Sequence, residues 1–245
     1  MAAAQRRDRA DPDPHIETRS GSGLDPVVPP IHEGPLPRNL GPFQLLSRVP
    51  GEEPYAIFSG RFRTDGGLSH PAIVLVAAAG GPGVEPLERE AELAARVAGP
   101  GIMAPLDVLR RVDAFALALA RPAGRTAAEI TRQVGQRNGR VDAHAALFIA
   151  VRLLDALARC HEALDDAGRR LEIVHRAVTL DRVWVGLDGS VHLRGLGYAQ
   201  TRDQAGIDPP AGWPPAFSAA DHRRGQYDAR TDLFGVGALL YALLT

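Results

Sequence analysis

The chain has 245 residues and a formal net charge of −1, which is long enough for one large domain or two small lobes with a buried core. This near-neutral balance excludes a global charge that would attract nucleic acid or an anionic membrane. All 28 basic residues are arginine, so the chain cannot supply a lysine amine to any reaction. Cys160 is the only cysteine, which excludes an internal disulfide or a cysteine metal cluster and indicates a cytoplasmic protein.

Residues 1–38 are predicted to form a disordered, Pro-rich arm. They contain seven prolines, mixed charges and no apolar periodicity. No apolar segment of a secretory signal follows the charged N-terminus. Such an arm can tether or regulate a domain, or it can be a tail without a task, and its composition favours the tail.

A small sheet with one helix is predicted next, between residue 39 and residue 121. Short β-prone or aliphatic runs, separated by turn residues, predict strands at 43–46, 55–58, 71–76, 102–109 and 114–120. Residues 86–97 predict an amphipathic helix. Its apolar face consists of Leu87, Ala91, Ala94 and Val97.

Helices are predicted to dominate the second half, residues 122–245. The patterns favour helices at 127–134, at 143–161 and from Asp232 onward. The buried stripe of the long helix is predicted to be Leu147, Val151, Leu154, Leu157 and Ala158. The Asp-Gly turn in residues 187–190 predicts a hairpin between strands at 183–185 and 191–193. Residues 173–174 predict a further strand, and residues 200–220 predict a long loop.

Three motifs stand in an ordered series along this pattern. Glu90 lies in the first helix, before the turn Gly99-Pro100-Gly101-Ile102. His175-Arg176 follows an aliphatic run, and residues 228–237 read Asp-Ala-Arg-Thr-Asp-Leu-Phe-Gly-Val-Gly. Together they resemble the protein kinase family, most closely its bacterial serine/threonine members. The resemblance implies an α+β, two-lobed fold, with an N-lobe at 39–121 and a C-lobe at 122–245 that is C-terminally incomplete.

The resemblance also places the nucleotide cleft. Pro50, Glu52 and Tyr55 occupy the positions of the glycine-rich loop, where prolines cannot donate an amide and a carboxylate repels phosphate. Ala72 and Val74 align with the alanine and the lysine of the third strand. The family uses ATP and magnesium, and these replacements predict that this chain binds neither.

The catalytic positions are replaced as well. Ala177 stands in place of the base, Arg182 in place of the loop asparagine, and Gly195 in place of the metal-binding aspartate. An arginine opposes a metal ion by its charge, so no metal site is predicted. Asp181 is either a displaced base or a surface turn residue, and the turn residue is favoured.

Several structural positions are retained in this resemblance. His175, Arg176 and Leu196 keep their places in and after the catalytic loop, and Asp232 aligns with the aspartate that anchors that loop. Glu90 keeps its place but lacks its lysine, so it either pairs with Arg61 or Arg63 or lies in solvent, which is favoured. Trp184 aligns with the residue beneath the adenine and is predicted to close the cleft or to pack in the core.

These observations predict a pseudokinase, a kinase-like domain that acts in signalling by binding an unidentified protein partner. One alternative is an ATP-dependent serine/threonine kinase with non-standard catalytic residues. Another is a fragment or remnant without independent function.

In the activation segment, residues 219–221 read Ala-Ala-Asp where Ala-Pro-Glu is expected, and Thr201 and Ser218 are predicted to be plain loop residues.

Overall fold

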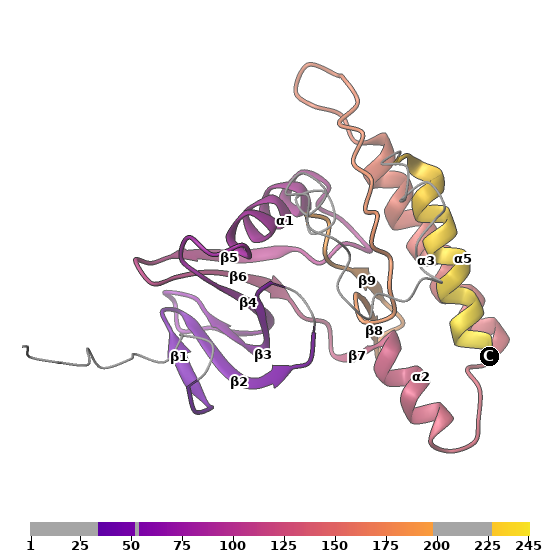
Figure 1. Ribbon diagram of the computed structural model, residues 1–245, viewed down its shortest axis with the longest axis horizontal. Coiled ribbons are helices and arrows are strands. Elements are labelled where there is room, and N and C mark those ends of the chain that lie inside the picture. The colour runs from indigo at the N-terminus through magenta and orange to yellow at the C-terminus, as the bar shows by residue number, and fades with distance from the viewer. Residues whose placement is uncertain (1–33, 52–53, 198–226) are drawn as a thin grey trace, which may run out of the picture.

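The computed structural model describes residues 34–51, 54–197 and 227–245 (Figure 1). Within these residues the chain is α+β, with a curled antiparallel sheet and four helices, as the sequence predicts. The loop at 200–220, with Thr201, Ser218 and residues 219–221, lies outside the described residues. So do Glu52 and residues 1–33 of the expected arm. Arg38, the last residue of that arm, is already paired with Leu45 in a strand.

The larger sheet has six antiparallel strands in the order β1-β2-β3-β4-β6-β5. The strands are β1 (Arg38–Leu40), β2 (Phe43–Val49), β3 (Ala56–Arg63), β4 (Ser69–Ala78), β5 (Pro105–Arg110) and β6 (Ala114–Ala120). Helix α1 (Val84–Arg96) packs on one face, where Leu87 is fully buried. The opposite face has a second cluster around Phe43 and Phe58. Apolar side chains cover both faces, and β4 is accordingly aliphatic at every position from residue 72 to residue 78.

A second, three-stranded sheet lies between the larger sheet and the helices of the second half of the chain (Figure 1). It consists of β7 (Gly124–Thr126), β8 (Val183–Gly186) and β9 (Val191–Leu193). The predicted Asp-Gly hairpin between β8 and β9 is confirmed. The pairing of β7 with β8 was not predicted, because residues 124–126 have no apolar alternation. A Cβ at residue 124 would collide with the Val185 carbonyl, so only glycine permits this pairing.

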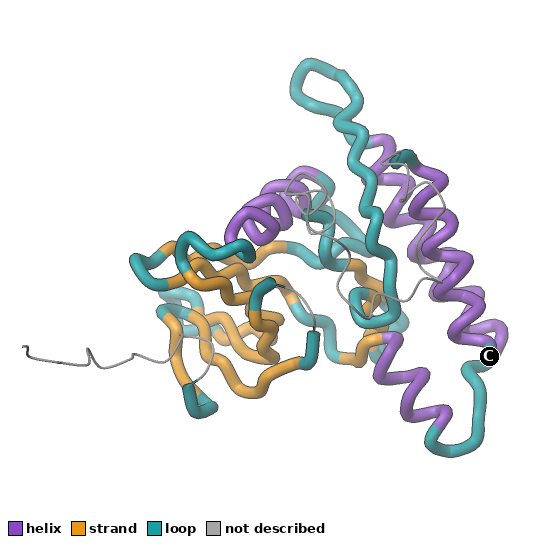
Figure 2. Tube along the Cα trace, in the orientation of Figure 1, coloured by secondary structure: helices purple, strands orange, loops and turns teal. Residues whose placement is uncertain are grey.

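Three of the four described helices begin at side-chain caps. Thr126 and Glu129 form a capping box at the start of α2 (Ala127–Gly135). Asp142 caps α3 (Ala143–Glu162) and Asp228 caps α5 (Ala229–Leu244). Helices α3 and α5 lie side by side (Figure 2). No helix among the described residues has the length and apolarity needed to cross a bilayer.

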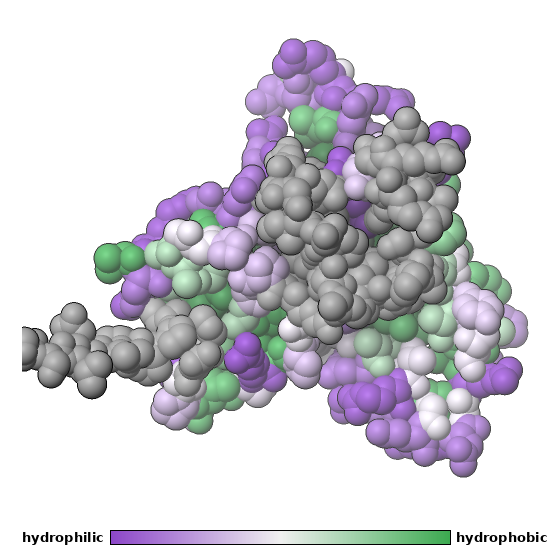
Figure 3. Space-filling model, in the orientation of Figure 1, coloured by the Kyte–Doolittle hydropathy of each residue, from purple (hydrophilic) through white to green (hydrophobic). Residues whose placement is uncertain are grey.

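The buried face of α3 differs from the predicted one. Of the predicted stripe, Leu157 is buried, but Leu147, Val151 and Leu154 are 52%, 54% and 38% exposed. The buried positions are Ala146, Ile149, Ala150, Leu153, Ala156, Leu157 and Cys160. This face is rich in small residues, which permit close packing, whereas the helix is apolar on more than one side. Hydrophobic residues are accordingly exposed over the α3–α5 pair (Figure 3).

The segment between α3 and β8 contains no strand, so the strand predicted at 173–174 is wrong. Its first part is a protruding loop, closed by the bridge between Leu164 and Arg170 (Figure 2). Ile173 and Val174 are buried, but neither belongs to a strand. Their apolar character therefore reflects burial, which the sequence pattern does not distinguish from strand formation.

Candidate functional site

A buried carboxylate fixes the backbone of the loop that precedes β8. Asp232, in the first turn of α5, is 1% exposed. Its Oδ2 accepts the amide of His175 at 2.8 Å, and its Oδ1 accepts the amide of Arg176 at 2.7 Å. His161 Nε2 of α3 lies 2.8 Å from Oδ2. The sequence predicts that Asp232 anchors the loop. It gives no indication that His161 contacts the same carboxylate.

His175 connects this loop to the end of β9. Its Nδ1 accepts the amide of Ala177 at 3.2 Å, so Nε2 carries the proton and donates to the Arg194 carbonyl at 2.9 Å. The side chain is fully buried, and burial lowers its pKa to about 4. His175 is therefore a neutral structural link at physiological pH.

Arg176 adopts a conformation that few side chains favour. Its φ angle is 62°, in the left-handed region. Its guanidinium lies 4.1 Å from the centroid of the Tyr227 ring, a cation–π geometry. The loop is thus tied to the residue just before the cap of α5, through a side chain as well as through Asp232.

Glu90 of α1 is buried, so the expectation that it lies in solvent is wrong. It is 3% exposed, and its Oε1 accepts the amide of Gly195 at 2.7 Å. Its Oε2 accepts the amide of Gly197 at 3.0 Å. Arg61 and Arg63, the expected partners, lie on β3 and make no ion pair with it. Backbone amides have taken the place of a lysine, and the sequence pattern could not show this.

The Glu90 carboxyl group is buried beside backbone amides and two arginines. Burial raises its pKa above the ordinary value, and the two glycine amides and the charges of Arg194 and Arg182 oppose that rise. A Cβ at residue 197 would collide with the backbone of α1. Because Gly197 has none, the segment can approach the helix closely. Leu196, between the two glycines, is fully buried in the cluster of α3 and α5.

Two buried arginines lie at and next to the positions where the resemblance expects metal ligands: Arg182 at the asparagine position, and Arg194 directly before Gly195. Arg182 and Arg194 are 3% and 4% exposed. Arg182 Nη1 would be 3.1 Å from a Cβ at Gly195, so the guanidinium lies against that glycine. Asp181 Oδ2 is 4.0 Å from Arg182 Nε and 3.7 Å from Arg194 Nη2, and its Oδ1 accepts from Thr179 Oγ1 at 2.6 Å. Asp181 thus belongs to an ion cluster.

The pKa of Asp181 is lowered. Burial alone would raise it, but the charges of Arg182 and Arg194, together with the hydrogen bond from Thr179, outweigh burial. Because of this lowered pKa, the carboxylate is charged at neutral pH. Its side chain is half exposed, so solvent can reach it.

Val74 and Ala72 do not face Glu90, which corrects their assignment to the cleft. Both belong to the cluster on the sheet face away from α1, while Ile73 and Leu75 face α1. Because side chains alternate along a strand, a shift of one residue exchanges the faces. The residues of this segment that face α1 are therefore Ile73 and Leu75. The uniformly aliphatic run gave no means of choosing the register.

Aromatic side chains fill the α1 side of the sheet near the loop. Tyr55 and Trp184 are 8% and 6% exposed and belong to one apolar cluster with Ile73, Leu75 and Ala177. The Trp184 indole packs in this core, and Pro50 is exposed at the end of β2. Of the two alternatives predicted for Trp184, the structure therefore shows the packing in the core.

The residues assembled here do not fit magnesium triphosphate. Magnesium requires oxygen ligands, and its expected ligand positions carry a guanidinium and a glycine without a side chain. Within the described residues, no three His, Cys, Asp or Glu side chains are grouped so that they could hold a metal ion. The cluster can bind its own backbone and neutralise its own charges, which are structural tasks.

No protein-family model matches the chain. It is similar to the tyrosine-protein kinase MasK of Myxococcus xanthus strain DK1622, with 25% identity over 166 residues, which are 66% of this chain and 26% of MasK. It is similar to the probable serine/threonine-protein kinase CPE1738 of Clostridium perfringens strain 13, with 25% identity over 165 residues, which are 66% of this chain and 22% of that protein. The chain thus matches about a quarter of each curated relative. These distant relatives support a protein kinase-like family.

Proposed function

We propose that the chain is a pseudokinase that acts in signalling by binding a protein partner. Its two-lobed architecture consists of an N-lobe at residues 39–121, built on the larger sheet and α1, and a C-lobe at residues 122–245. The distant kinase relatives and the Asp232–loop link support this proposal. The named activities of the two relatives differ, so neither supplies a substrate for this chain.

One observation carries the proposal: the guanidinium of Arg182 lies against Gly195. In a kinase these two positions hold magnesium through an asparagine and an aspartate. Here a fixed positive charge takes that space, and a side chain at residue 195 would press on it. The two replacements fit each other sterically, and each removes a metal ligand.

The sheet side of the cleft supports the same proposal. Leu75 faces α1 where an amine would be required, and Trp184 and Tyr55 pack in the apolar cluster beside it. An indole buried in this cluster leaves less room for an adenine ring than a leucine side chain would. The lost charge and the added bulk both act against nucleotide binding.

Asp181 favours the alternative of an active kinase, because its lowered pKa leaves the carboxylate deprotonated and able to accept a proton. However, it accepts the Thr179 hydroxyl and faces two guanidinium groups, which compete with a substrate hydroxyl. We therefore assign it to the ion cluster.

The experiment that tests the proposal is phosphate transfer from radiolabelled ATP to general protein acceptors with serine, threonine and tyrosine. We expect no transfer above a heat-inactivated control, because losses in a cooperating set of catalytic groups remove most of the rate enhancement. Transfer by the wild type that disappears in Asp181→Asn would contradict the proposal and favour the active kinase.

A further inference from the structure

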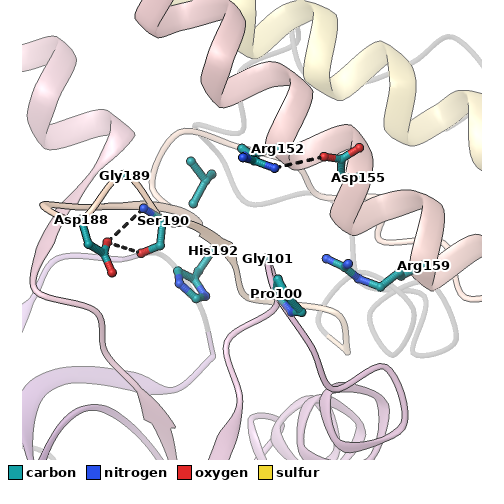
Figure 4. A pocket seen from close by; sticks show the side chains of 10 residues that line it. Pro100, Gly101, Arg152, Asp155, Arg159, Asp188, Gly189, Ser190 and His192 are labelled. Carbon is teal, nitrogen blue, oxygen red and sulfur yellow. Dashed lines mark hydrogen bonds and ion pairs between the residues drawn. The ribbon is translucent and has the colours of Figure 1, made fainter.

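A second site lies outside the loop cluster, at a pocket between three elements (Figure 4). One wall is helix α3, with Arg152, Asp155 and Arg159. The others are residues 100–101, after α1, and the turn and strand at 188–192. Its volume of about 470 Å³ is in the range of binding pockets.

Backbone hydrogen bonds join the segments that form the floor of this pocket. The Leu193 amide of β9 donates a hydrogen bond to the Gly101 carbonyl at 2.8 Å, and the Met103 amide donates one to the Leu193 carbonyl at 3.0 Å. Gly101 has a φ of 91°, and a Cβ there would be 2.7 Å from Ala156 Cβ and 3.4 Å from Arg159 Nη2. The missing side chain keeps open the space beside the Arg159 guanidinium.

The two carboxylates of the pocket already have donors. Asp188 Oδ1 accepts the amide and the hydroxyl of Ser190 at 3.0 and 2.6 Å, and these bonds lower the pKa of Asp188. Asp155 faces Arg152 at 3.7 Å on the same helix. Both carboxylates are therefore committed within the protein (Figure 4).

Arg159 is in the opposite situation. Among the residues that the structure describes, its guanidinium has neither a hydrogen bond nor an ion pair. It points toward Pro100 and Gly101, and His192 lies beyond them along the wall of the pocket (Figure 4). An arginine offers five donors in a planar fork that fits a carboxylate. The pocket therefore supplies donors and needs an acceptor.

An apolar surface continues from the pocket along α3. The Arg152 guanidinium lies 5.2 Å from the Phe148 ring centroid, and that ring is 43% exposed. Arg159 and Phe148 are eleven positions apart, which is about 16 Å along a helix. An extended segment of about five residues spans that distance.

We propose that this pocket binds an extended acidic segment of a partner protein. A carboxylate pairs with Arg159 beside Gly101, and an apolar side chain about five residues away packs on Phe148. This deepens the proposed function, since it names the chemistry of the partner that a binding domain would take.

The test uses the full chain and a fluorescein-labelled synthetic peptide with two adjacent glutamates and a leucine pair five residues further on. We expect saturable binding by fluorescence anisotropy, and Arg159→Glu should weaken it by roughly tenfold or more, because a charged pair is lost and a repulsion gained. Arg132→Glu is the matched control, since it makes the same charge change on exposed α2. It should leave the affinity unchanged.

A peptide with lysines in place of the glutamates measures the sign of the preference. Absence of saturable binding by the acidic peptide, equal binding of the lysine peptide, or equal weakening by Arg159→Glu and Arg132→Glu would each overturn the proposal. Melting temperatures establish that both variants are folded. Phosphate transfer is measured separately, so failure here and failure of the pseudokinase proposal are distinguishable.

Discussion

At the scale of single residues, two buried carboxylates position the loops of the site. Asp232 accepts the amides of His175 and Arg176, and Glu90 accepts those of Gly195 and Gly197. A buried charge is tolerated only where donors converge on it. Both carboxylates therefore have a structural reason to be present that does not depend on phosphate transfer.

The neutral state of His175 predicts a pH dependence of stability. The pKa of His175 is about 4 in the folded protein, against 6.5 for an ordinary histidine. Between these values the unfolded chain binds a proton that the folded chain does not, so the free energy of unfolding falls as the pH falls. We expect a loss of about 3 kcal/mol from this residue across that interval, measured by urea unfolding at a series of pH values.

The comparison that isolates this effect uses His175→Gln and His144→Gln. The amide of glutamine can accept and donate as the imidazole does but does not titrate, so His175→Gln should lack this part of the acid loss. His144 is 96% exposed, and its replacement should leave the pH profile as in the wild type. Identical slopes for all three proteins would contradict a neutral, buried His175.

Residue identity alone could not place every member of the site. Asp232 and His175 follow recognisable motifs, so their neighbourhood could be predicted. Val74 could not be told from Leu75, because the pattern of β4 is aliphatic on both faces and the register is set by packing. Glu90 finds backbone partners more than a hundred residues away, and no local pattern encodes them.

At the scale of elements, helix α3 shows what periodicity can and cannot supply. Its bounds were predicted closely, because a long apolar pattern marks them. Its buried face was not, because leucines and valines occur on two sides of the helix. The side that packs against α5 and β9 is the one with alanines and Cys160, where close approach is possible.

Adjacent leucines in α3 test this orientation. Leu153 is fully buried and Leu154 is 38% exposed. Leu153→Ala should lower the free energy of unfolding by about 2–5 kcal/mol, because it leaves a cavity. Leu154→Ala should cost less than about 1 kcal/mol. Chemical denaturation measures both, and a larger loss for Leu154→Ala would mean that the predicted stripe, and not the described one, is buried.

At the scale of the whole molecule, the order of elements was predictable and their long-range links were not. The succession of strands, helix, strand pair and helices follows from local patterns, and so does the β8–β9 hairpin. The pairing of β7 with β8 depends on a glycine that admits a neighbouring backbone. The protruding loop and the bridge from Ile102 to Leu193 likewise depend on contacts between distant segments.

On our proposal that the chain is a pseudokinase, these links keep a kinase-like architecture together without kinase chemistry. Asp232 and His175 join α5, the loop and β9, and Glu90 joins α1 to the segment after β9. Each link joins a charged or polar side chain to backbone groups of a distant segment. Arg182 and Arg194 then supply positive charge inside the protein, beside Asp181.

The most direct measurement of the central claim is thermal unfolding with millimolar ATP, with and without magnesium. A ligand that binds the native state raises its stability by about 2.7 kcal/mol at a hundredfold excess over the dissociation constant. We expect no rise in melting temperature for the wild type under either condition. Arg182 and Gly195 oppose the binding of magnesium, and Trp184 opposes the binding of the adenine ring. A rise confined to Trp184→Leu would assign the closure to the indole. A clear magnesium-dependent rise in the wild type would contradict the account.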